Sequence, residues 1–263
     1  MCGIFGYSLA KPVSLKKTFN VLERLEVHQY PQELKPVGGY GAGVAILLND
    51  GSISTEKVGK TNGSPVRQLA ETVNAKFDEA SVLLSHVRMP SPEFMKSAKF
   101  KETAQPYVAE PDPNSTIISI HNGKVENYKE LRKKLSKEHV FESEKIQLVD
   151  SEVIPHYFAE LLNESEDTDE ALYKLFCVLQ GSNAIAMLQI DEENTFLHLL
   201  HKGKTRGLTV WINERNEVIF SSRKEPLIGG FGKMLITGKF KEKISIPFKE
   251  NAGLKLSYPI SSK

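Results

Sequence analysis

The second residue of the chain is a cysteine, and its position could make it a nucleophile. In the opening segment Met1-Cys2-Gly3-Ile4-Phe5-Gly6, removal of the initiator methionine would expose the Cys2 thiol and a free α-amino group together. An α-amino group titrates near neutrality, so it can serve as general base for the thiol without a neighbouring histidine. The sequence therefore predicts an N-terminal nucleophile at Cys2.

The residues after Cys2 favour a strand. Ile4, Phe5 and Tyr7 are strand formers, and the glycines beside them permit close approach of neighbouring backbones. We therefore expect the thiol at the tip of a buried strand. The alternative is that Cys2 is an ordinary small residue in a flexible start.

Arg88 and Asp150 could recognise the two charged ends of an amino acid. Arg88 follows an apolar strand expected over residues 81–84, and its planar guanidinium can grip a carboxylate with two hydrogen bonds. Asp150 precedes an expected helix, where its carboxylate could receive an ammonium group. Each also has a plain alternative, a surface ion pair for Arg88 and a helix cap for Asp150.

Asn122 and Gly123 follow a strand expected over residues 115–120. A side-chain amide and a glycine N–H can converge there on one oxygen, which is the composition of an oxyanion hole. The alternative is an ordinary Asn-Gly turn.

The elements that must position these residues suggest an α+β fold. Strand-type and helix-type patterns occur in separate runs, which favours helices covering the faces of sheets. A polar, proline-containing segment over residues 96–113 is expected to be a long loop. Further strands are expected over residues 44–48, 52–58, 184–190, 195–200, 209–212 and 218–221, and helices over residues 12–26, 127–135, 152–162, 169–179 and from residue 65.

Composition argues against several classes of protein. The chain has 263 residues and a formal net charge of +1, which gives no global electrostatic case for nucleic acid or an anionic membrane. No apolar stretch approaches the roughly 20 residues that span a bilayer, and no leader pattern is present, so we expect a cytoplasmic protein.

Cysteine and histidine usage indicates no disulfide framework and no metal site. The two cysteines, Cys2 and Cys177, are expected to be reduced, with Cys177 a buried small hydrophobe on a helix. The seven histidines show no metal-ligand spacing, and the glycines at 38–43 lack the ending of a phosphate loop. We expect no metal, no nucleotide and no cofactor.

Several motifs together make the chain resemble the class II glutamine amidotransferases, whose glutaminase domains are N-terminal-nucleophile hydrolases. The similarity is to the glutaminase halves of glucosamine-6-phosphate synthase and amidophosphoribosyltransferase, and it extends to about residue 230. The motifs that carry it are the opening Cys2 segment, Arg24-Leu25-Glu26, Gly41-Ala42-Gly43, Ser85-His86-Val87-Arg88, His121-Asn122-Gly123, Asp150-Ser151-Glu152 and Ser221-Ser222-Arg223.

The resemblance implies a four-layer αββα sandwich and hydrolysis of glutamine to glutamate and ammonia. Cys2 would be the nucleophile, and Asn122 with the Gly123 N–H would stabilise the tetrahedral intermediate. Arg88 would hold the α-carboxylate of glutamine and Asp150 its α-ammonium. Ser91 takes the place of a family threonine near that carboxylate.

The chain departs from the family pattern in three places. His28 stands where the synthases carry an arginine, and about ten residues are inserted before Gly41. Met89 replaces an aromatic residue after Arg88. These differences leave open whether His28 replaces the arginine in part or is a loop histidine without a catalytic role.

The family usually continues into a synthase domain, whereas here residues 231–263 are too few for one. We therefore expect one glutaminase-type domain over residues 1–263, in which residues 231–263 could form a C-terminal extension, with one or two strands or a tail over residues 240–260. The ammonia would go to an acceptor on a separate synthase or transferase subunit. The alternatives are a non-catalytic glutamine sensor of the same fold, an amidase for other amides and a structural subunit.

Overall fold

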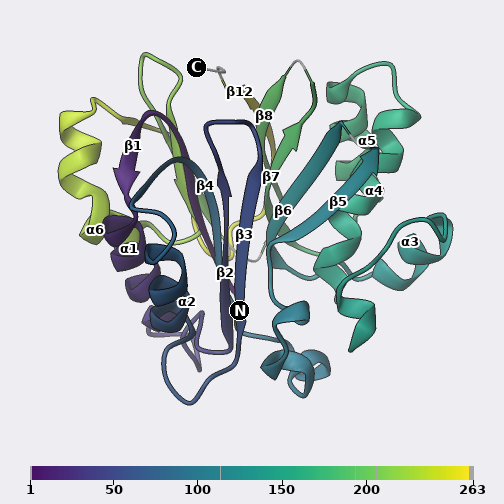
Figure 1. The fold of residues 1–263 in the computed structure, drawn as a ribbon, viewed down its shortest axis with the longest axis horizontal. Helices are drawn as coiled ribbons and strands as arrows, with labels where there is room; N and C mark the ends of the chain where they lie inside the picture. Colours follow the sequence, from purple (N-terminus) through teal and green to yellow (C-terminus); the bar gives the residue numbers. More distant parts are fainter. Residues whose placement is uncertain (1, 113, 193, 205–206, 261–263) are drawn as a thin grey trace.

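The computed structural model describes residues 2–112, 114–192, 194–204 and 207–260. In these residues the strands form two antiparallel sheets that lie face to face, and helices cover the outer face of each (Figure 1). The expected αββα arrangement is confirmed. Met1, whose removal the sequence analysis raises, lies outside the described residues.

The first sheet has β1 near its centre, so the strand that follows Cys2 is flanked on both sides. Antiparallel neighbours β10 and β4 pair with it. The order across the described sheet is β11 (Lys241–Ile246), β9 (Leu208–Ile212), β10 (Val218–Ser221), β1 (Gly3–Ser14), β4 (Glu79–Val87), β2 (Gly41–Leu47) and β3 (Ile53–Gly59).

The second sheet contains the strand that ends in the Asn-Gly pair. Its described order is β12 (Ala252–Pro259), β8 (Thr195–Gly203), β7 (Asn183–Ile190), β6 (Ser115–Gly123) and β5 (Tyr107–Asp112). The two C-terminal strands, β11 and β12, add to different sheets, each at an edge. The expectation of strands between residues 240 and 260 is therefore confirmed.

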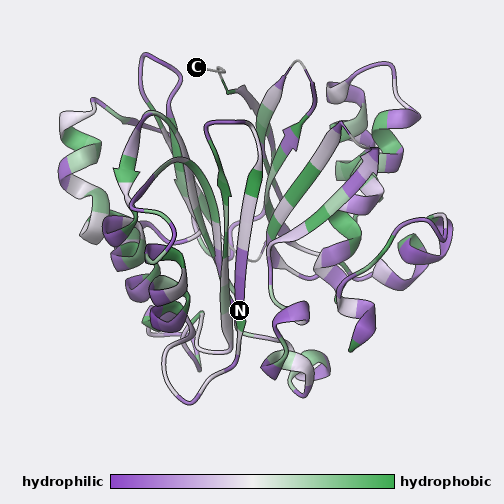
Figure 2. Cartoon of the chain, in the orientation of Figure 1, coloured by the Kyte–Doolittle hydropathy of each residue, from purple (hydrophilic) through white to green (hydrophobic). Residues whose placement is uncertain are grey.

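Three apolar layers hold the sandwich together. One lies between the two sheets and includes Ile4, Ile118 and Leu199. The other two lie between each sheet and its helices, and Figure 2 shows green residues along the strands. The first sheet carries α1 (Leu15–Val27), α2 (Pro65–Asn74) and α6 (Lys224–Thr237), and the second carries α3 (Tyr128–Lys134), α4 (Val153–Asn163) and α5 (Thr168–Val178).

Local sequence signals explain where these helices begin. The Ser64 hydroxyl accepts a hydrogen bond from the Arg67 N–H at 3.1 Å, and Pro65 occupies the first helical position of α2, where no donor is needed.

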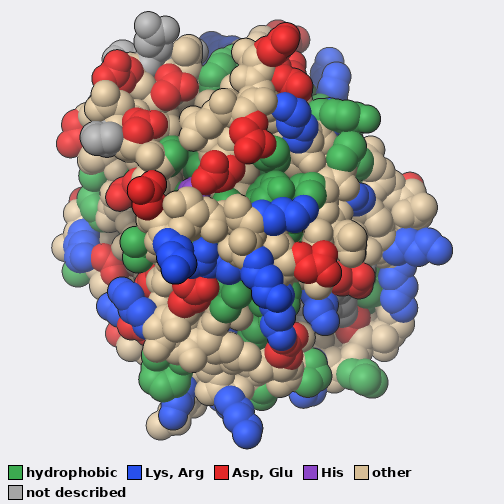
Figure 3. All heavy atoms as spheres, turned by 90° about the vertical axis from the view of Figure 1, so that its right-hand side faces the viewer, with side chains coloured by type: hydrophobic (Ala, Val, Ile, Leu, Met, Phe, Trp, Pro, Cys, Tyr) green, Lys and Arg blue, Asp and Glu red, His purple; other side chains and the backbone are tan. Residues whose placement is uncertain are grey.

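Over the face formed by α3, α4 and α5, acidic and basic side chains are interspersed (Figure 3). Among the described residues, no helix is long and apolar enough to cross a membrane.

The segment expected to be a loop over residues 96–113 is partly ordered structure. It holds the 3₁₀ turns Ser97–Lys99 and Lys101–Thr103 and the strand β5; Pro113 lies outside the described residues. A third such turn, Pro92–Phe94, precedes it. The strand escaped prediction because Pro111 suggests a break, yet β5 lies at a sheet edge, where a missing N–H is tolerated.

Three further expectations need correction. Asn122 and Gly123 do not follow β6 but belong to it, pairing with Ala184 and Asn183 of β7. Cys177 is exposed rather than buried, because the apolar face of α5 is carried by neighbours such as Leu175. Helix α6 was not expected at all, since its glycines lower the helical propensity of the segment.

Candidate active site

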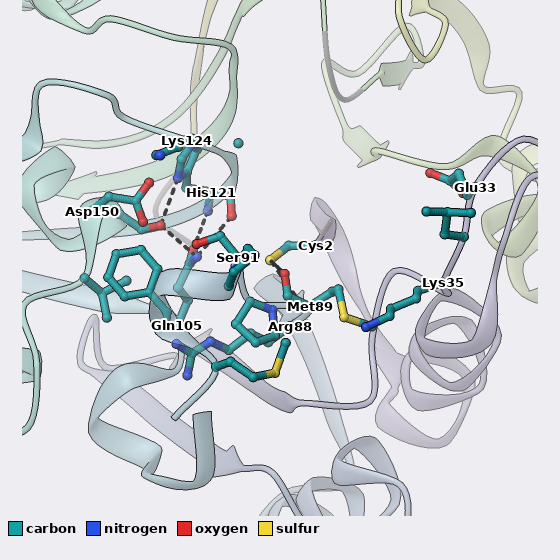
Figure 4. Close-up of a pocket in the computed structure, with 18 of the residues that line it drawn as sticks. Cys2, Glu33, Lys35, Arg88, Met89, Ser91, Gln105, His121, Lys124 and Asp150 are labelled. Carbon is teal, nitrogen blue, oxygen red and sulfur yellow. Dashed lines mark hydrogen bonds between the residues drawn. The ribbon is translucent and has the colours of Figure 1, made fainter. Parts of the chain in front are cut away.

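A cavity of about 770 Å³ opens where strands of both sheets end (Figure 4). Five of the six residues singled out from the sequence line it: Cys2, Arg88, Ser91, Gly123 and Asp150. They come from the start of β1, the segment after β4, the end of β6 and the 3₁₀ turn Asp150–Glu152 before α4. The packing of the two sheets thus brings together residues that are far apart in the chain.

Cys2 is half-buried and lies beside the main chain of Met89. Its sulfur accepts a hydrogen bond from the Met89 N–H at 3.4 Å and lies 3.5 Å from the Met89 carbonyl oxygen. The register of β1 explains this contact, because Gly3 pairs with Val87. A Cβ atom on Gly3 would lie 2.8 Å from the Leu25 side chain, so the glycine permits this close packing.

Arg88 is buried without a carboxylate partner in the described part of the chain. One of its terminal nitrogens donates a hydrogen bond to the Thr103 hydroxyl at 2.6 Å, and its main-chain N–H donates to the Gly41 carbonyl at 2.8 Å. Burial lowers the pKa of the guanidinium from its ordinary value, but arginine remains protonated in proteins. The cavity therefore contains an unpaired cation.

Asp150 is the acidic counterpart of Arg88. Its Oδ2 atom accepts a hydrogen bond from the Val125 N–H at 2.9 Å, and none of the ion pairs among the described residues includes it. Burial raises the pKa of this carboxyl to about 7. A bound ammonium group would favour the ionised carboxylate and lower that pKa.

Asn122 and Ser91 hold polar atoms that have no partner among the described residues. The Asn122 side chain is fully buried, and neither its amide nitrogen nor its oxygen makes a hydrogen bond. The Ser91 hydroxyl is also buried and unpartnered. Buried polar groups are normally hydrogen-bonded, so both positions are suited to a ligand. However, Asn122 is not among the residues that line the cavity.

The inserted segment before Gly41 forms another wall of the cavity. Glu33 and Lys35 line it, together with Phe248 from the segment between β11 and β12. Figure 4 shows Lys35 extending toward the Cys2 side of the cavity. Sequence reasoning missed this wall, because only the length of the insertion distinguished it.

A buried arginine supports that wall. Arg223 forms an ion pair with Glu33 at 2.5 Å, and its guanidinium carbon lies 4.3 Å from the ring centre of Tyr30 and 4.8 Å from that of Phe248. His28 lies nearby, and burial, followed by the charge of Arg223, lowers its pKa. His28 is not among the residues that line the cavity.

No group of three or more histidine, cysteine, aspartate or glutamate side chains in the described ranges could hold a metal ion. The cavity itself presents a thiol, an unpaired cation and a buried carboxyl.

Several known proteins are similar to this chain. A model of the glutamine amidotransferase domain matches residues 94–229. The glutamine–fructose-6-phosphate aminotransferase of Aquifex aeolicus is 32% identical over 198 residues, which are 75% of this chain and 29% of that protein. The corresponding protein of Sulfurisphaera tokodaii is 28% identical over 236 residues, covering 89% and 32% of the two chains. The chain thus spans about a third of the length of these relatives.

The fold also occurs in a solved structure. The glutamine phosphoribosylpyrophosphate amidotransferase of B. subtilis superposes with a TM-score of 0.64 at 16% identity, over 100% of this chain and 50% of that one. At this identity the likeness concerns the fold alone. The family match extends over more than half of the 263 residues, and the chain therefore belongs to the glutamine amidotransferase domain family.

Proposed function

We propose that this protein hydrolyses glutamine to glutamate and ammonia with Cys2 as the nucleophile. The observation that carries the proposal is the charge pattern of the cavity. An unpaired cation, Arg88, and an unpaired carboxyl, Asp150, line the same space as a half-buried thiol. Glutamine is a zwitterion with an amide at its far end, so it would supply a partner for each.

The chemistry would proceed through a thioester. The α-amine of Cys2, once freed, takes the thiol proton, and the sulfur attacks the amide carbon of glutamine. The same proton then passes to the departing nitrogen, which leaves as ammonia. Water attacks the thioester, the C–S bond breaks, and glutamate and the thiol are released.

Asn122 and Gly123 would stabilise the negative charge that develops on the amide oxygen. A donor of this kind contributes roughly 10²–10³-fold to the rate in other acyl-transfer enzymes. The unpartnered Asn122 amide supports this role, although a movement of its side chain toward the cavity is required. Ser91 would add a hydrogen bond to the substrate carboxylate beside Arg88.

The test is labelling with diazo-oxo-norleucine, a glutamine analogue that alkylates the nucleophile, followed by peptide mass spectrometry and an assay of ammonia release. We expect one adduct on Cys2, and loss of hydrolysis by at least about 10⁴-fold in Cys2→Ala. Cys177→Ala is the matched control, because it removes the exposed cysteine outside the cavity. Hydrolysis that persists in Cys2→Ala would refute the proposal.

A glutamine sensor of the same fold is the competing function. Arg88 and Asp150 would serve a sensor equally well, whereas the thiol at the cavity would have no use there. Glutamine binding by a wild-type protein that neither hydrolyses it nor reacts with the analogue would favour the sensor.

We further propose that the ammonia is used by an acceptor bound on a separate synthase or transferase subunit. The names of the relatives state a phosphorylated sugar as the co-substrate, and the match covers about a third of the sequence relatives. Hydrolysis by the isolated chain should then be slow and should rise when the partner binds. Full, acceptor-independent turnover by the purified chain would contradict this.

A further inference from the structure

His121 precedes the Asn-Gly pair on β6 and is almost completely buried. Its ring nitrogens contact two different segments: Nε2 lies 2.9 Å from the Asn183 Oδ1 atom at the start of β7, and Nδ1 lies 2.9 Å from the Ser151 hydroxyl. The ring therefore connects the ends of two strands to the turn that carries Asp150.

The hydrogen bonds define which ring nitrogen carries the proton. The Asn183 amide nitrogen faces the Gln180 carbonyl oxygen at 3.5 Å, so its Oδ1 atom faces His121 and can only accept. Nε2–H is therefore the donor. In the neutral imidazole Nδ1 is then the acceptor, so the Ser151 hydroxyl, which accepts a hydrogen bond from the Gln105 amide at 3.1 Å, donates to it.

The Gln105 side chain holds the main chain of His121. Its amide nitrogen donates to the His121 carbonyl at 3.0 Å, and its oxygen accepts from the His121 N–H. Figure 4 shows the hydrogen bonds that converge on Gln105 and His121. Side chain and main chain of His121 are thus both held, which leaves a single arrangement for the ring.

The ring also lies directly against the oxyanion position. A Cβ atom on Gly123 would lie 2.4 Å from the His121 Nε2 atom. Ser151, its other neighbour, adjoins Asp150 in the chain. One imidazole therefore spans the two positions that would hold opposite ends of glutamine, the reacting amide and the α-ammonium.

We infer that His121 is a positioning residue that sets the spacing between the Asn122–Gly123 pair and the Asp150 carboxylate. This inference rests on the proposed glutamine hydrolysis. The length of glutamine fixes the distance between its ammonium and its amide, and a displacement of about 1 Å can reduce a rate roughly 10²-fold. His121 also lines the cavity, and the role inferred for it is to hold Asn122–Gly123 and the Asp150 turn at a fixed separation through its hydrogen bonds.

Two variants test the two sides of the hydrogen-bond network around His121 separately. Ser151→Ala removes the hydrogen bond beside Asp150, and we expect a roughly tenfold higher KM for glutamine with kcat changed less than about threefold. His121→Phe removes both ring hydrogen bonds at similar volume, and we expect kcat/KM to fall roughly 10²-fold, with kcat included in the loss. In the double variant the effects should be non-additive, because both changes break the same link.

His198→Phe is the matched control for loss of a buried histidine. His198 lies in the same sheet, is fully buried, and hydrogen-bonds through both ring nitrogens to Gln189 and Ser257 at 3.0 Å. We expect a comparable loss of stability from this variant but unchanged KM and kcat. The steady-state constants of all variants are measured well below their unfolding temperatures.

The outcomes distinguish this inference from the function on which it rests. A wild-type protein that neither hydrolyses nor binds glutamine would overturn the proposed function, and the inference with it. Normal wild-type hydrolysis, with His121→Phe indistinguishable from His198→Phe and Ser151→Ala unchanged in KM, would overturn the inference alone. If His121→Phe does not fold, the KM of Ser151→Ala tests the inference: a raised KM supports it, and an unchanged KM overturns it.

Discussion

Two buried sets of an arginine and a carboxylate, one at the cavity and one in the wall beside it, differ in their pairing. In the wall formed by the segment before Gly41, Glu33 forms an ion pair with Arg223. Arg223 is 1% exposed and Glu33 is 6% exposed. At the catalytic end, Arg88 and Asp150 are 4% and 5% exposed, yet neither has an ionic partner in the described part of the chain. The two sets are buried to a similar extent, so the difference between them is that only the first forms an ion pair.

This contrast separates a structural role from a binding role. The charge of Arg223 is compensated by Glu33 and by two aromatic rings, while its Nε and Nη1 atoms have no hydrogen-bond partner among the described residues. Arg88 and Asp150 are held apart by the fold, and desolvation without a partner destabilises the charged form of each. A zwitterionic substrate would relieve both at once. The uncompensated set is therefore the one we assign to glutamine.

The largest effect on stability is expected from Arg223→Met. This change leaves Glu33 buried without its ionic partner, and breaking a buried ion pair costs about 3–5 kcal/mol of unfolding free energy. Urea denaturation measures the loss, and we expect KM for glutamine to stay within about threefold at temperatures where the variant is folded. Undiminished stability with a much higher KM would mean that the wall binds substrate.

Arg88→Met should show the opposite pattern. Loss of two charge-assisted hydrogen bonds to the substrate carboxylate should raise KM roughly 10²-fold. The unfolding free energy should be unchanged or higher, because an unpaired buried cation is removed. Steady-state kinetics and urea denaturation of the same preparation test both parts. A strongly destabilised Arg88→Met protein with normal KM would make Arg88 a structural residue.

Asp150→Asn should stabilise the unliganded protein at neutral and alkaline pH. The pKa of Asp150 is raised from 3.8 to about 7, so between these values the native state holds a proton that the unfolded state has lost. The wild type therefore loses stability as pH rises from about 4 to 7, and the variant does not lose this contribution. We expect a gain of about 1–3 kcal/mol at pH 8 that vanishes near pH 4.

Other buried groups with shifted pKa values do not affect that comparison. The pKa of Glu152 is also raised to about 7 by burial, and burial lowers that of His86 to about 3. These groups are present in both proteins, so their contributions cancel in the difference. A variant no more stable than the wild type at pH 8 would contradict the assigned cause.

The smallest effect concerns the pH dependence of glutamine binding. Because the ammonium requires an ionised Asp150, affinity should fall by up to tenfold per pH unit below about pH 7. Calorimetry on Cys2→Ala measures binding without reaction, and because the α-amine is kept in this background, the Asp150→Asn variant of it reports any contribution from the titration of that amine. Asp150→Asn in the same background should bind weakly at every pH. A flat profile in the Cys2→Ala protein would separate Asp150 from the ammonium.

Local patterns predicted much of the fold because local forces determine those elements. The Ser64–Pro65 start of α2 is specified by a cap and a proline, and the β2–β3 hairpin by the turn at residues 49–51. Strand β5 and helix α6 were not predicted from the sequence. Their segments have weak strand and helix propensities, and pairing at the sheet edge and packing against the sheet outweigh these. Cys177 was misjudged because helical spacing leaves open which neighbouring face is covered.

The amino-acid types and their order already specify the reactive groups: a cysteine able to follow a removed methionine, an arginine after an apolar strand, an Asn-Gly pair and an aspartate before a helix. Which of the charges are compensated depends on tertiary contacts. Glu33 pairs with Arg223, which is 190 residues away in the sequence. Arg88 and Asp150 line one cavity without an ionic partner among the described residues. Pairing and desolvation depend on contacts between distant segments, and those exist only once the two sheets have packed.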